Sequence, residues 1–160
     1  MSGPNMPSIH SATAPDGAHL EYEVVGDGEP LVILHGIFAG RRTFSSQREL
    51  ADRYRLILPS LRGHDGSGKE LPPDYGIDTS DLRDLCAVLN VEAERFHLIG
   101  HSSGGAVAVA FARQYPERVR KLVLIEPTLL SLLPSGGRAR IEREWGEVAE
   151  EGRRSGDRAA

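Results

Sequence analysis

The chain has 160 residues, a length that fits one folding unit around a single buried core. Its formal net charge is −4, with acidic and basic residues interspersed, so it lacks the basic surface typical of nucleic-acid-binding proteins. A single cysteine excludes an intrachain disulfide, and no apolar run has the length of a membrane span or the pattern of a secretory signal. These features predict a cytoplasmic protein that binds neither nucleic acid nor membranes.

The first predicted elements are two strands, at residues 9–14 and 19–26. The segment PDGA between them is rich in turn residues, which predicts a hairpin. The continuous apolar run at residues 30–36 then predicts a strand buried on both faces. The same signature recurs at residues 54–60, 96–102 and 121–127.

Helical segments separate these apolar runs. They are predicted at residues 43–52, 78–90 and 103–115, and the second places Leu82, Leu85, Cys86 and Leu89 on one face. Strands that alternate with helices indicate an α/β fold with a mostly parallel sheet and helices on both of its faces. After Pro127 the character changes to a loop-like apolar stretch and then a highly charged helix, which we expect to lie outside the sheet.

A short motif joins the fifth predicted strand to the helix after it. Residues 100–104 read Gly-His-Ser-Ser-Gly, which is the pattern G-x-S-x-G in the strand–turn–helix context that it requires. Such a sharp turn strains the backbone of Ser102, and glycines at positions 100 and 104 avoid steric collisions. Ser102 is therefore a candidate nucleophile, although an isolated pattern of this kind also fits an ordinary turn serine.

Two backbone amides are candidates to hold negative charge next to this serine. The amide of Ser103 starts the helix, where free N–H groups and the helix dipole favour an anion. HGIFAG, residues 35–40, follows the third predicted strand, and its first glycine leaves the amide of Ile37 free to face Ser102. Next to this loop, Arg41 and Arg42 are expected at a solvated helix start, with contact to an anionic substrate as the alternative.

Four segments resemble those of the α/β-hydrolase fold family, in the family's order, over residues 19–127. They are LVILHG, LRGHDGSG, FHLIGHSSGG and YPERVRKLVLIEP. The resemblance implies that Ser102 is the nucleophile and that the amides of Ile37 and Ser103 form the oxyanion hole. It also implies that the elbow is supported by His35, Gly36, Gly100, His101 and Gly104.

The reaction that this resemblance implies is acyl transfer to a serine. Serine rather than aspartate at the elbow argues against the family's dehalogenases and epoxide hydrolases, which use a carboxylate. We expect a hydrolase of carboxylic esters or related acyl substrates such as lactones, with carbon–carbon bond hydrolysis and cofactor-free peroxidase chemistry as open alternatives. The expected partner is a small-molecule substrate, and neither a metal nor an organic cofactor is implied.

The sequence departs from the family's pattern in one loop. The family usually reads D-x-R-G-x-G-x-S, whereas residues 60–67 read Ser-Leu-Arg-Gly-His-Asp-Gly-Ser. The departures are Ser60, in place of the aspartate, and Asp65, in place of the second glycine. They leave the nucleophile untouched.

The family's later strands and its catalytic histidine have no counterpart here, because all six histidines precede the position where that histidine would fall. We therefore expect an incomplete hydrolase core at residues 1–127, truncated before the last strands, and the start of a helical cap or lid at residues 128–160. Glu126, after the sixth predicted strand, resembles an alternative position for the acid, although acidic residues also commonly cap strand ends.

Without the histidine, this chain alone is expected to be inactive, because the members of a catalytic triad act as a unit. A non-catalytic protein that keeps the fold for binding or interaction is the competing interpretation, since a fold alone does not determine a function.

Overall fold

The computed structural model describes residues 6–68, 80–134, 136–137, 139–141 and 143–144. The chain divides into two compact units, Met1–Thr128 and Leu129–Ala160. The first unit contains the sheet, its helices and the candidate site.

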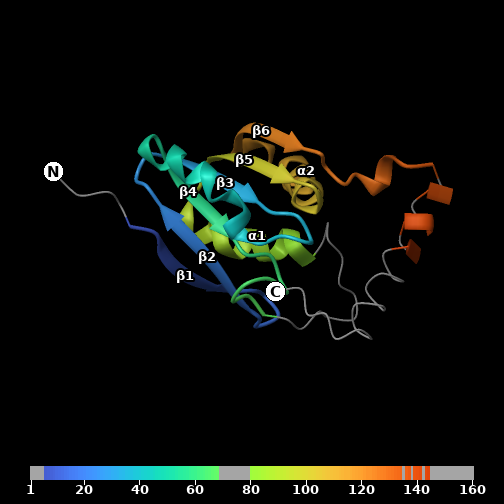
Figure 1. The fold of residues 1–160 in the computed structure, drawn as a ribbon, viewed down its shortest axis with the longest axis horizontal. Coiled ribbons are helices and arrows are strands. Elements are labelled where there is room, and N and C mark those ends of the chain that lie inside the picture. The colour runs from blue at the N-terminus through green and yellow to red at the C-terminus, as the bar shows by residue number, and fades with distance from the viewer. Residues whose placement is uncertain (1–5, 69–79, 135, 138, 142, 145–160) are drawn as a thin grey trace. The chain divides into compact units, whose positions relative to one another are not determined.

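A six-stranded sheet in the order β1-β2-β4-β3-β5-β6 forms the centre of the first unit (Figure 1). The strands are β1 (Ser8–Thr13), β2 (His19–Val25), β3 (Glu29–Leu34), β4 (Tyr54–Pro59), β5 (Phe96–His101) and β6 (Val119–Ile125). β1 and β2 form the predicted antiparallel hairpin, and β2 is also antiparallel to β4. The pairs β3–β4, β3–β5 and β5–β6 are parallel, which confirms the mostly parallel α/β sheet.

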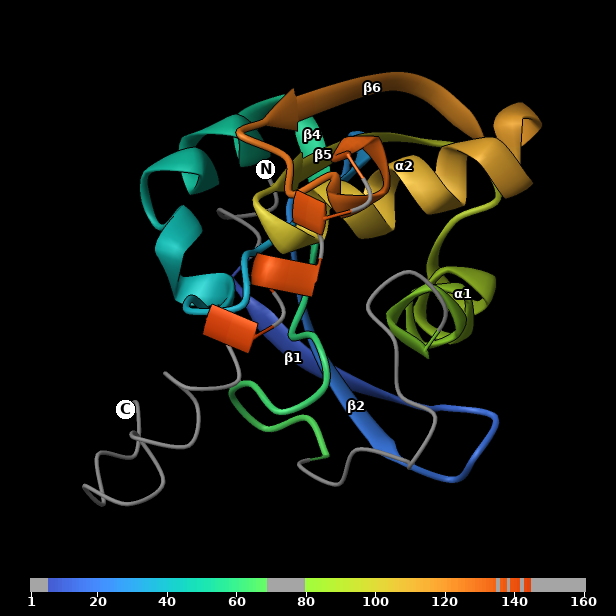
Figure 2. The ribbon, with the colours of Figure 1, turned by 90° about the vertical axis from the view of Figure 1, so that its right-hand side faces the viewer.

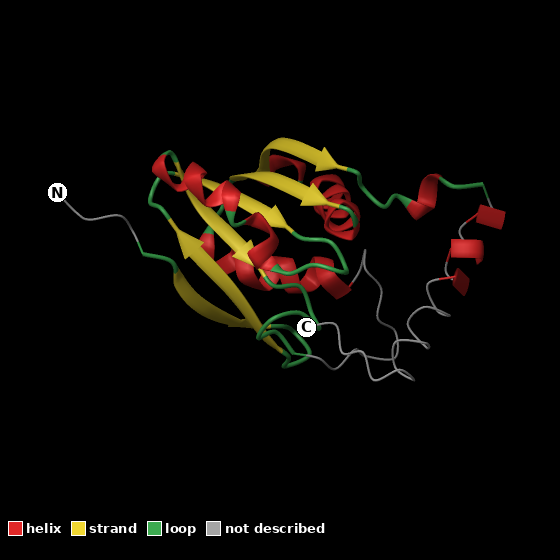
Figure 3. Cartoon of the chain, viewed as in Figure 1, coloured by secondary structure: helices red, strands yellow, loops and turns green. Residues whose placement is uncertain are grey.

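Five described helical elements of the first unit lie between these strands. They are the 3₁₀-helices η1 (Arg41–Phe44), η2 (Ser46–Asp52) and η3 (Pro116–Arg118) and the α-helices α1 (Ser80–Glu92) and α2 (Ser103–Gln114), drawn in red in Figure 3. The segment predicted as one helix at residues 43–52 is thus two 3₁₀ pieces. The amides of Ser45 and Arg48 bond to the carbonyl oxygens three residues before them, which is the 3₁₀ pattern.

The sheet has an apolar core on each face. Figure 2 shows α1 and α2 together on one side of the sheet. The larger core joins α1 and α2 to the strands and includes Leu85, Leu89, Phe96, Val107 and Phe111. The smaller core lies under η1 and η2 and includes Ile33, Phe44, Leu56 and Leu58. Helices therefore cover both faces, as the alternating pattern predicts.

The register between β3 and β5 determines where the candidate site forms. Leu34, the last residue of β3, is paired with Gly100 near the end of β5. Because parallel strands end at the same edge of a sheet, the loop after β3 and the turn after β5 lie next to each other. The sheet thus brings together two motifs that are separated by about half of the first unit's length.

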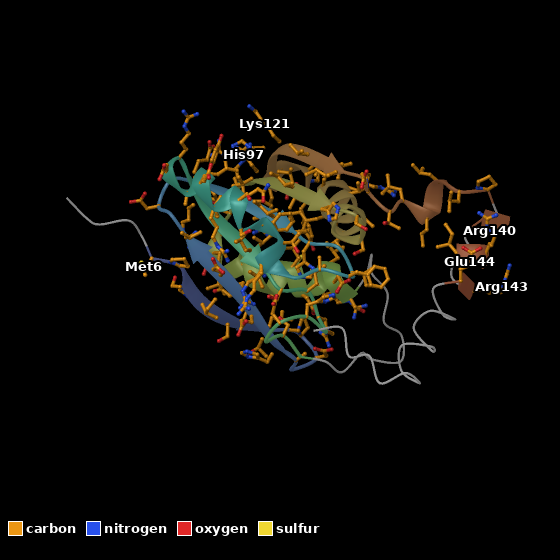
Figure 4. All side chains as sticks on the ribbon, viewed as in Figure 1. Met6, His97, Lys121, Arg140, Arg143 and Glu144 are labelled. Carbon is orange, nitrogen blue, oxygen red and sulfur yellow. The ribbon has the colours of Figure 1, made fainter. Side chains whose placement is uncertain are left out.

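The second unit begins with the short helix η4 (Leu130–Leu132), and its described residues between 136 and 144 are helical. Arg140 and Glu144 form an ion pair 3.5 Å long on this helical stretch (Figure 4). The rest of the charged segment, residues 145–160, lies outside the described residues. Among the helices that the structure describes, none is both long enough and apolar enough to cross a membrane.

Candidate active site

Ser102 occupies the sharp turn between β5 and α2. Its backbone has φ 53° and ψ −122°, in the positive-φ region that favours glycine. Three hydrogen bonds fix this conformation: Ser102 N–H donates to Ile125 O (3.0 Å), and Ser102 O accepts from the amides of Gly105 (2.9 Å) and Thr128 (3.0 Å). A strain of roughly 1–3 kcal/mol persists only where the surroundings hold it, as they do here.

The glycines on either side of Ser102 are required by close packing. A Cβ at Gly100 would lie 2.5 Å from Gly104 O, and a Cβ at Gly104 would collide with the carbonyl oxygens of His35 and Leu34. Helix α2 therefore starts in direct contact with the end of β3. The steric reason for glycine that the motif predicts is present at both positions.

The side chain of Ser102 faces the loop that follows β3. A Cβ built on Gly36 would lie 2.9 Å from Ser102 Cβ and 3.3 Å from Ser102 Oγ. Only glycine allows this approach, and it places the peptide that leads to Ile37 beside the hydroxyl. Ile37 is 37% exposed, whereas Ser103, the other proposed amide donor, is 3% exposed at the start of α2.

His35 connects this loop to the segment after β4. Its Nε2 accepts a hydrogen bond from Leu61 N–H (2.9 Å), so its Nδ1 carries the proton and donates to Gly36 O (2.9 Å). The ring is completely buried, and burial lowers the pKa of His35 to about 4. The side chain is thus a neutral structural link, and both of its nitrogens are occupied by backbone groups.

Residues 60–68, called the 60–68 loop below, cover residues 35–40, called the 35–40 loop. The imidazole of His64 lies 2.7 Å from Ile37 O through Nε2 and 3.0 Å from Arg62 O through Nδ1. Its ring is also 4.7 Å from that of His35, centre to centre. His64 therefore contacts the carbonyl of the residue whose amide is the candidate oxyanion donor.

Arg41 is buried in an ion cluster, so the expectation of a solvated helix start is wrong for this residue. It is 8% exposed, and its guanidinium lies 2.5 Å from Glu21 and 3.4 Å from Asp65. It also donates to Ser60 Oγ (2.6 Å). Arg42 is exposed, as expected. The charge of Arg41 is therefore occupied by the protein's own carboxylates rather than offered to a substrate.

Glu126 directly follows β6, with an exposed side chain and φ 46°. Within the described part of the chain, its carboxylate has no hydrogen-bonding or ionic partner. His101 Nδ1 is buried and likewise has no hydrogen-bond partner among the described residues. The geometry thus places Glu126 at the same end of the sheet as Ser102, without joining it to a histidine.

The hydroxyl of Thr128 is a neighbour of the nucleophile that sequence reasoning missed. Its Oγ1 lies 3.3 Å from Ser102 Oγ, and it is the one hydrogen-bonding side chain near that oxygen among the described residues. None of the six histidines, all of them described, bonds to Ser102 Oγ. Thr128 follows β6 by three residues in an apolar, loop-like stretch, and no spacing pattern marks it.

The described residues contain no group of three or more His, Cys, Asp and Glu side chains arranged to hold a metal ion. The polar groups around Ser102 are backbone amides, carbonyls and one hydroxyl, together with His101 Nδ1, which would lie 3.4 Å from a Cβ at Gly36. This arrangement is suited to hydrogen bonding with an oxygen atom of a ligand.

Comparison with known proteins agrees with this geometry. Residues 29–155 match the family described as alpha/beta hydrolase fold. Lipase 1 of Psychrobacter immobilis is 34% identical over 122 residues, which are 74% of this chain and 38% of that protein. The 2-hydroxymuconate semialdehyde hydrolase of Pseudomonas sp. strain CF600 is 30% identical over 146 residues, 89% of this chain and 50% of that protein.

A solved structure gives the same result. The esterase from Thermogutta terrifontis is 32% identical, with a TM-score of 0.67, over 75% of this chain and 46% of that one. The match of the family over most of the chain establishes that this protein belongs to the α/β-hydrolase fold family. The chain spans between 32% and 50% of the length of the curated relatives that it matches.

Proposed function

We propose that this chain carries the nucleophile and the oxyanion hole of a hydrolase that acts on carboxylic esters or related acyl substrates. The observation that carries the proposal is the strained backbone of Ser102 in a strand–turn–helix elbow, with its side chain against Gly36. Related proteins that are named as lipases and as a semialdehyde hydrolase support the reaction class.

In the proposed reaction, Ser102 Oγ forms a bond to the carbonyl carbon of the substrate while its proton passes to a base. The carbonyl oxygen gains the negative charge and accepts hydrogen bonds from the amides of Ile37 and Ser103. Collapse of this intermediate breaks the bond to the leaving group, which takes the proton from the base. Water then attacks the acyl group on Ser102, releases the carboxylic acid and restores the hydroxyl.

The position of Ser103 supports its share of this role. Its amide is at the first position of α2, where N–H groups have no partner within the helix and the helix dipole is positive. Loss of a single oxyanion donor costs roughly 10²–10³ in turnover in a well-studied hydrolase. We therefore expect the hydrogen bond from the Ser103 amide to contribute substantially to the turnover rate.

The base in this proposal is a group other than the six histidines of the chain. His35 has both nitrogens engaged with the backbone, and none of the other five bonds to Ser102 Oγ. Glu126 is the candidate acid that would orient such a base, because it lies at the same edge of the sheet as Ser102. We further propose that residues 128–160 belong to the cap or lid of the enzyme.

The test is covalent labelling by a fluorophosphonate of the polypeptide purified as its natural source makes it. We expect one equivalent of label on the peptide that contains Ser102, none in the Ser102→Ala variant, and full labelling in Ser46→Ala, which removes an exposed serine of η2. The intact mass of the unlabelled polypeptide is recorded first, because it reveals whether the natural protein has residues that could supply the base.

Absence of labelling at Ser102 in a correctly folded natural polypeptide would contradict the proposal. It would favour a non-catalytic binding protein. The absence of a hydrogen bond between Ser102 Oγ and any of the six histidines also fits such a function. A ligand of such a protein should then bind Ser102→Ala with unchanged affinity.

A further inference from the structure

The 35–40 loop, which contains Ile37, is attached to the 60–68 loop at both of its ends. At its start, His35 accepts the hydrogen bond from the 60–68 loop described above. Just past its end, Arg41 N–H donates to Asp65 Oδ2 over 3.2 Å. The peptide proposed as an oxyanion donor therefore lies between two points that are held by the same neighbouring loop.

The attachment at the second end is a closed ring of hydrogen bonds. The guanidinium of Arg41 donates to Ser60 Oγ (2.6 Å), Ser60 Oγ donates to Asp65 Oδ2 (2.7 Å), and the same oxygen accepts the Arg41 amide. The carboxylate also packs directly on the backbone, since a Cβ at Gly40 would lie 2.8 Å from Asp65 Oδ2. Arg41 is thus fixed through both its side chain and its main chain.

The carboxylate in this ring comes from an unusual position. The family pattern that residues 60–67 resemble has aspartate at the position of Ser60 and glycine at the position of Asp65. The guanidinium of Arg41 lies against Ser60 Oγ, so a carboxylate at either position would meet it. The turn thus still contributes one carboxylate beside Arg41, in addition to those of Glu21 and Glu23, but supplies it from its other end.

The backbone of Asp65 shows that this exchange has a cost. Its φ is 46°, which favours glycine, although aspartate tolerates this region better than most residues. Burial alone would raise the pKa of Asp65, but hydrogen bonds from Ser60 and the Arg41 amide hold that pKa below its usual range. A strained residue with an ionised side chain, which is 19% exposed, thus stands where glycine would fit without strain.

We propose that Asp65 is a positioning residue, which has exchanged roles with position 60 and holds the 35–40 loop, through Arg41, in the conformation that presents the Ile37 amide. The catalytic meaning of this attachment rests on the proposed function, because only that proposal makes the Ile37 amide an oxyanion donor. The mechanical role of Asp65 stands independently of it.

The experiment compares the complete natural polypeptide with four variants: Asp65→Gly, Asp65→Asn, Ser60→Asp and the double exchange Ser60→Asp/Asp65→Gly. The probe is the hydrogen-exchange rate of the Ala39 amide, measured by NMR, because this N–H donates to Gly36 O (3.1 Å) within the 35–40 loop. The Gly105 amide, bonded to Ser102 O, serves as the internal reference.

We expect exchange at Ala39 to be about 10- to 100-fold faster in Asp65→Gly, given the usual contribution of a hydrogen bond to a charged group. Asp65→Asn keeps the shape and tolerates the positive φ, so its effect should be smaller. Ser60→Asp places two carboxylates side by side and should also accelerate exchange. The double exchange should restore a rate within a few-fold of the original, and the Gly105 amide should not change.

An unchanged exchange rate at Ala39 in Asp65→Gly would overturn the proposal. Exchange at Ala39 in the double variant that is as fast as in Asp65→Gly would also overturn it. Equal acceleration at Ala39 and Gly105 would also overturn it, because the effect would then be general destabilisation. The rate of fluorophosphonate labelling at Ser102 should decrease in the variants in which exchange at Ala39 becomes faster. If the unmodified polypeptide is not labelled, the proposed function fails, while the exchange rates still decide the role of Asp65.

Discussion

At the scale of single residues, the site depends on groups that are held in unfavourable states by their surroundings. Ser102, Asp65 and Glu126 are the three non-glycine residues with positive φ among those described. Ser102 and Glu126 directly follow β5 and β6, and Asp65 lies in the 60–68 loop after β4. His35 adds a buried neutral imidazole, with a pKa of about 4. Such features persist only where many contacts fix them, which is typical of functional sites.

The buried neutral state of His35 predicts a loss of stability in mild acid. The pKa of the folded state, about 4, is below the 6.5 of the unfolded chain, so between these values the unfolded state binds more protons. The stability is complete above pH 6.5 and decreases as the pH falls towards 4. We expect a loss of about 2 kcal/mol between pH 7 and pH 5 from this residue alone.

Urea unfolding at the two pH values measures this loss. In His35→Gln the difference between pH 7 and pH 5 should be smaller by that amount, whatever the variant's stability at pH 7. The exposed His19 provides the matched control, and His19→Gln should keep the full difference. The same pH dependence in His35→Gln as in the unmodified chain would show that His35 is not its source.

At the scale of elements, the site depends on the direct contact of α2 with the ends of β3 and β5. At Gly100 and Gly104 the backbones meet directly, because neither residue has a side chain that would separate them. The steric role of both glycines could be predicted from the sequence, because both are part of the G-x-S-x-G motif. It could not predict the ring formed by Arg41, Ser60 and Asp65, because that ring joins segments about 20 residues apart and depends on the direction of each side chain.

The packing at Gly100 gives a quantitative expectation. An alanine there would place Cβ 2.5 Å from Gly104 O and 2.8 Å from the Ala108 side chain, so helix and strand would have to separate. We expect Gly100→Ala to lower the free energy of unfolding by at least about 1–3 kcal/mol, the usual cost of overpacking. Gly136→Ala should have little effect, because a Cβ there meets nothing within 4 Å. Equal stabilities of the two variants in urea unfolding would contradict this account of the elbow.

At the scale of the whole molecule, the sheet has an edge that the described residues leave open. β6 pairs with β5 alone in the part of the chain that the structure describes. Its residues Leu122, Val123, Leu124 and Ile125 are 37–48% exposed. The alternating motifs of the sequence were sufficient to predict the strands and the order of the helices. The position of Thr128 beside Ser102 was not predictable, because it depends on how the chain turns after β6.

An apolar strand with a free edge promotes association between molecules. We expect the 160-residue chain to self-associate as its concentration increases, and Val123→Lys to reduce this association, because a lysine on an edge strand opposes pairing. Val91→Lys, at a 70% exposed position on α1, should not reduce it. Light scattering coupled to size-exclusion chromatography measures both. A chain that is monomeric at all concentrations, or an equal effect of the two variants, would contradict the role assigned to the β6 edge.

The central claim, that Ser102 is a nucleophile facing an oxyanion hole formed by Ile37 and Ser103, is tested most directly by a crystal structure of the phosphonylated natural polypeptide. We expect a covalent bond from Ser102 Oγ to phosphorus, with one phosphonyl oxygen about 2.7–3.1 Å from the amide nitrogens of Ile37 and Ser103. A phosphonyl oxygen that points away from both amides, or an adduct on another residue, would contradict it.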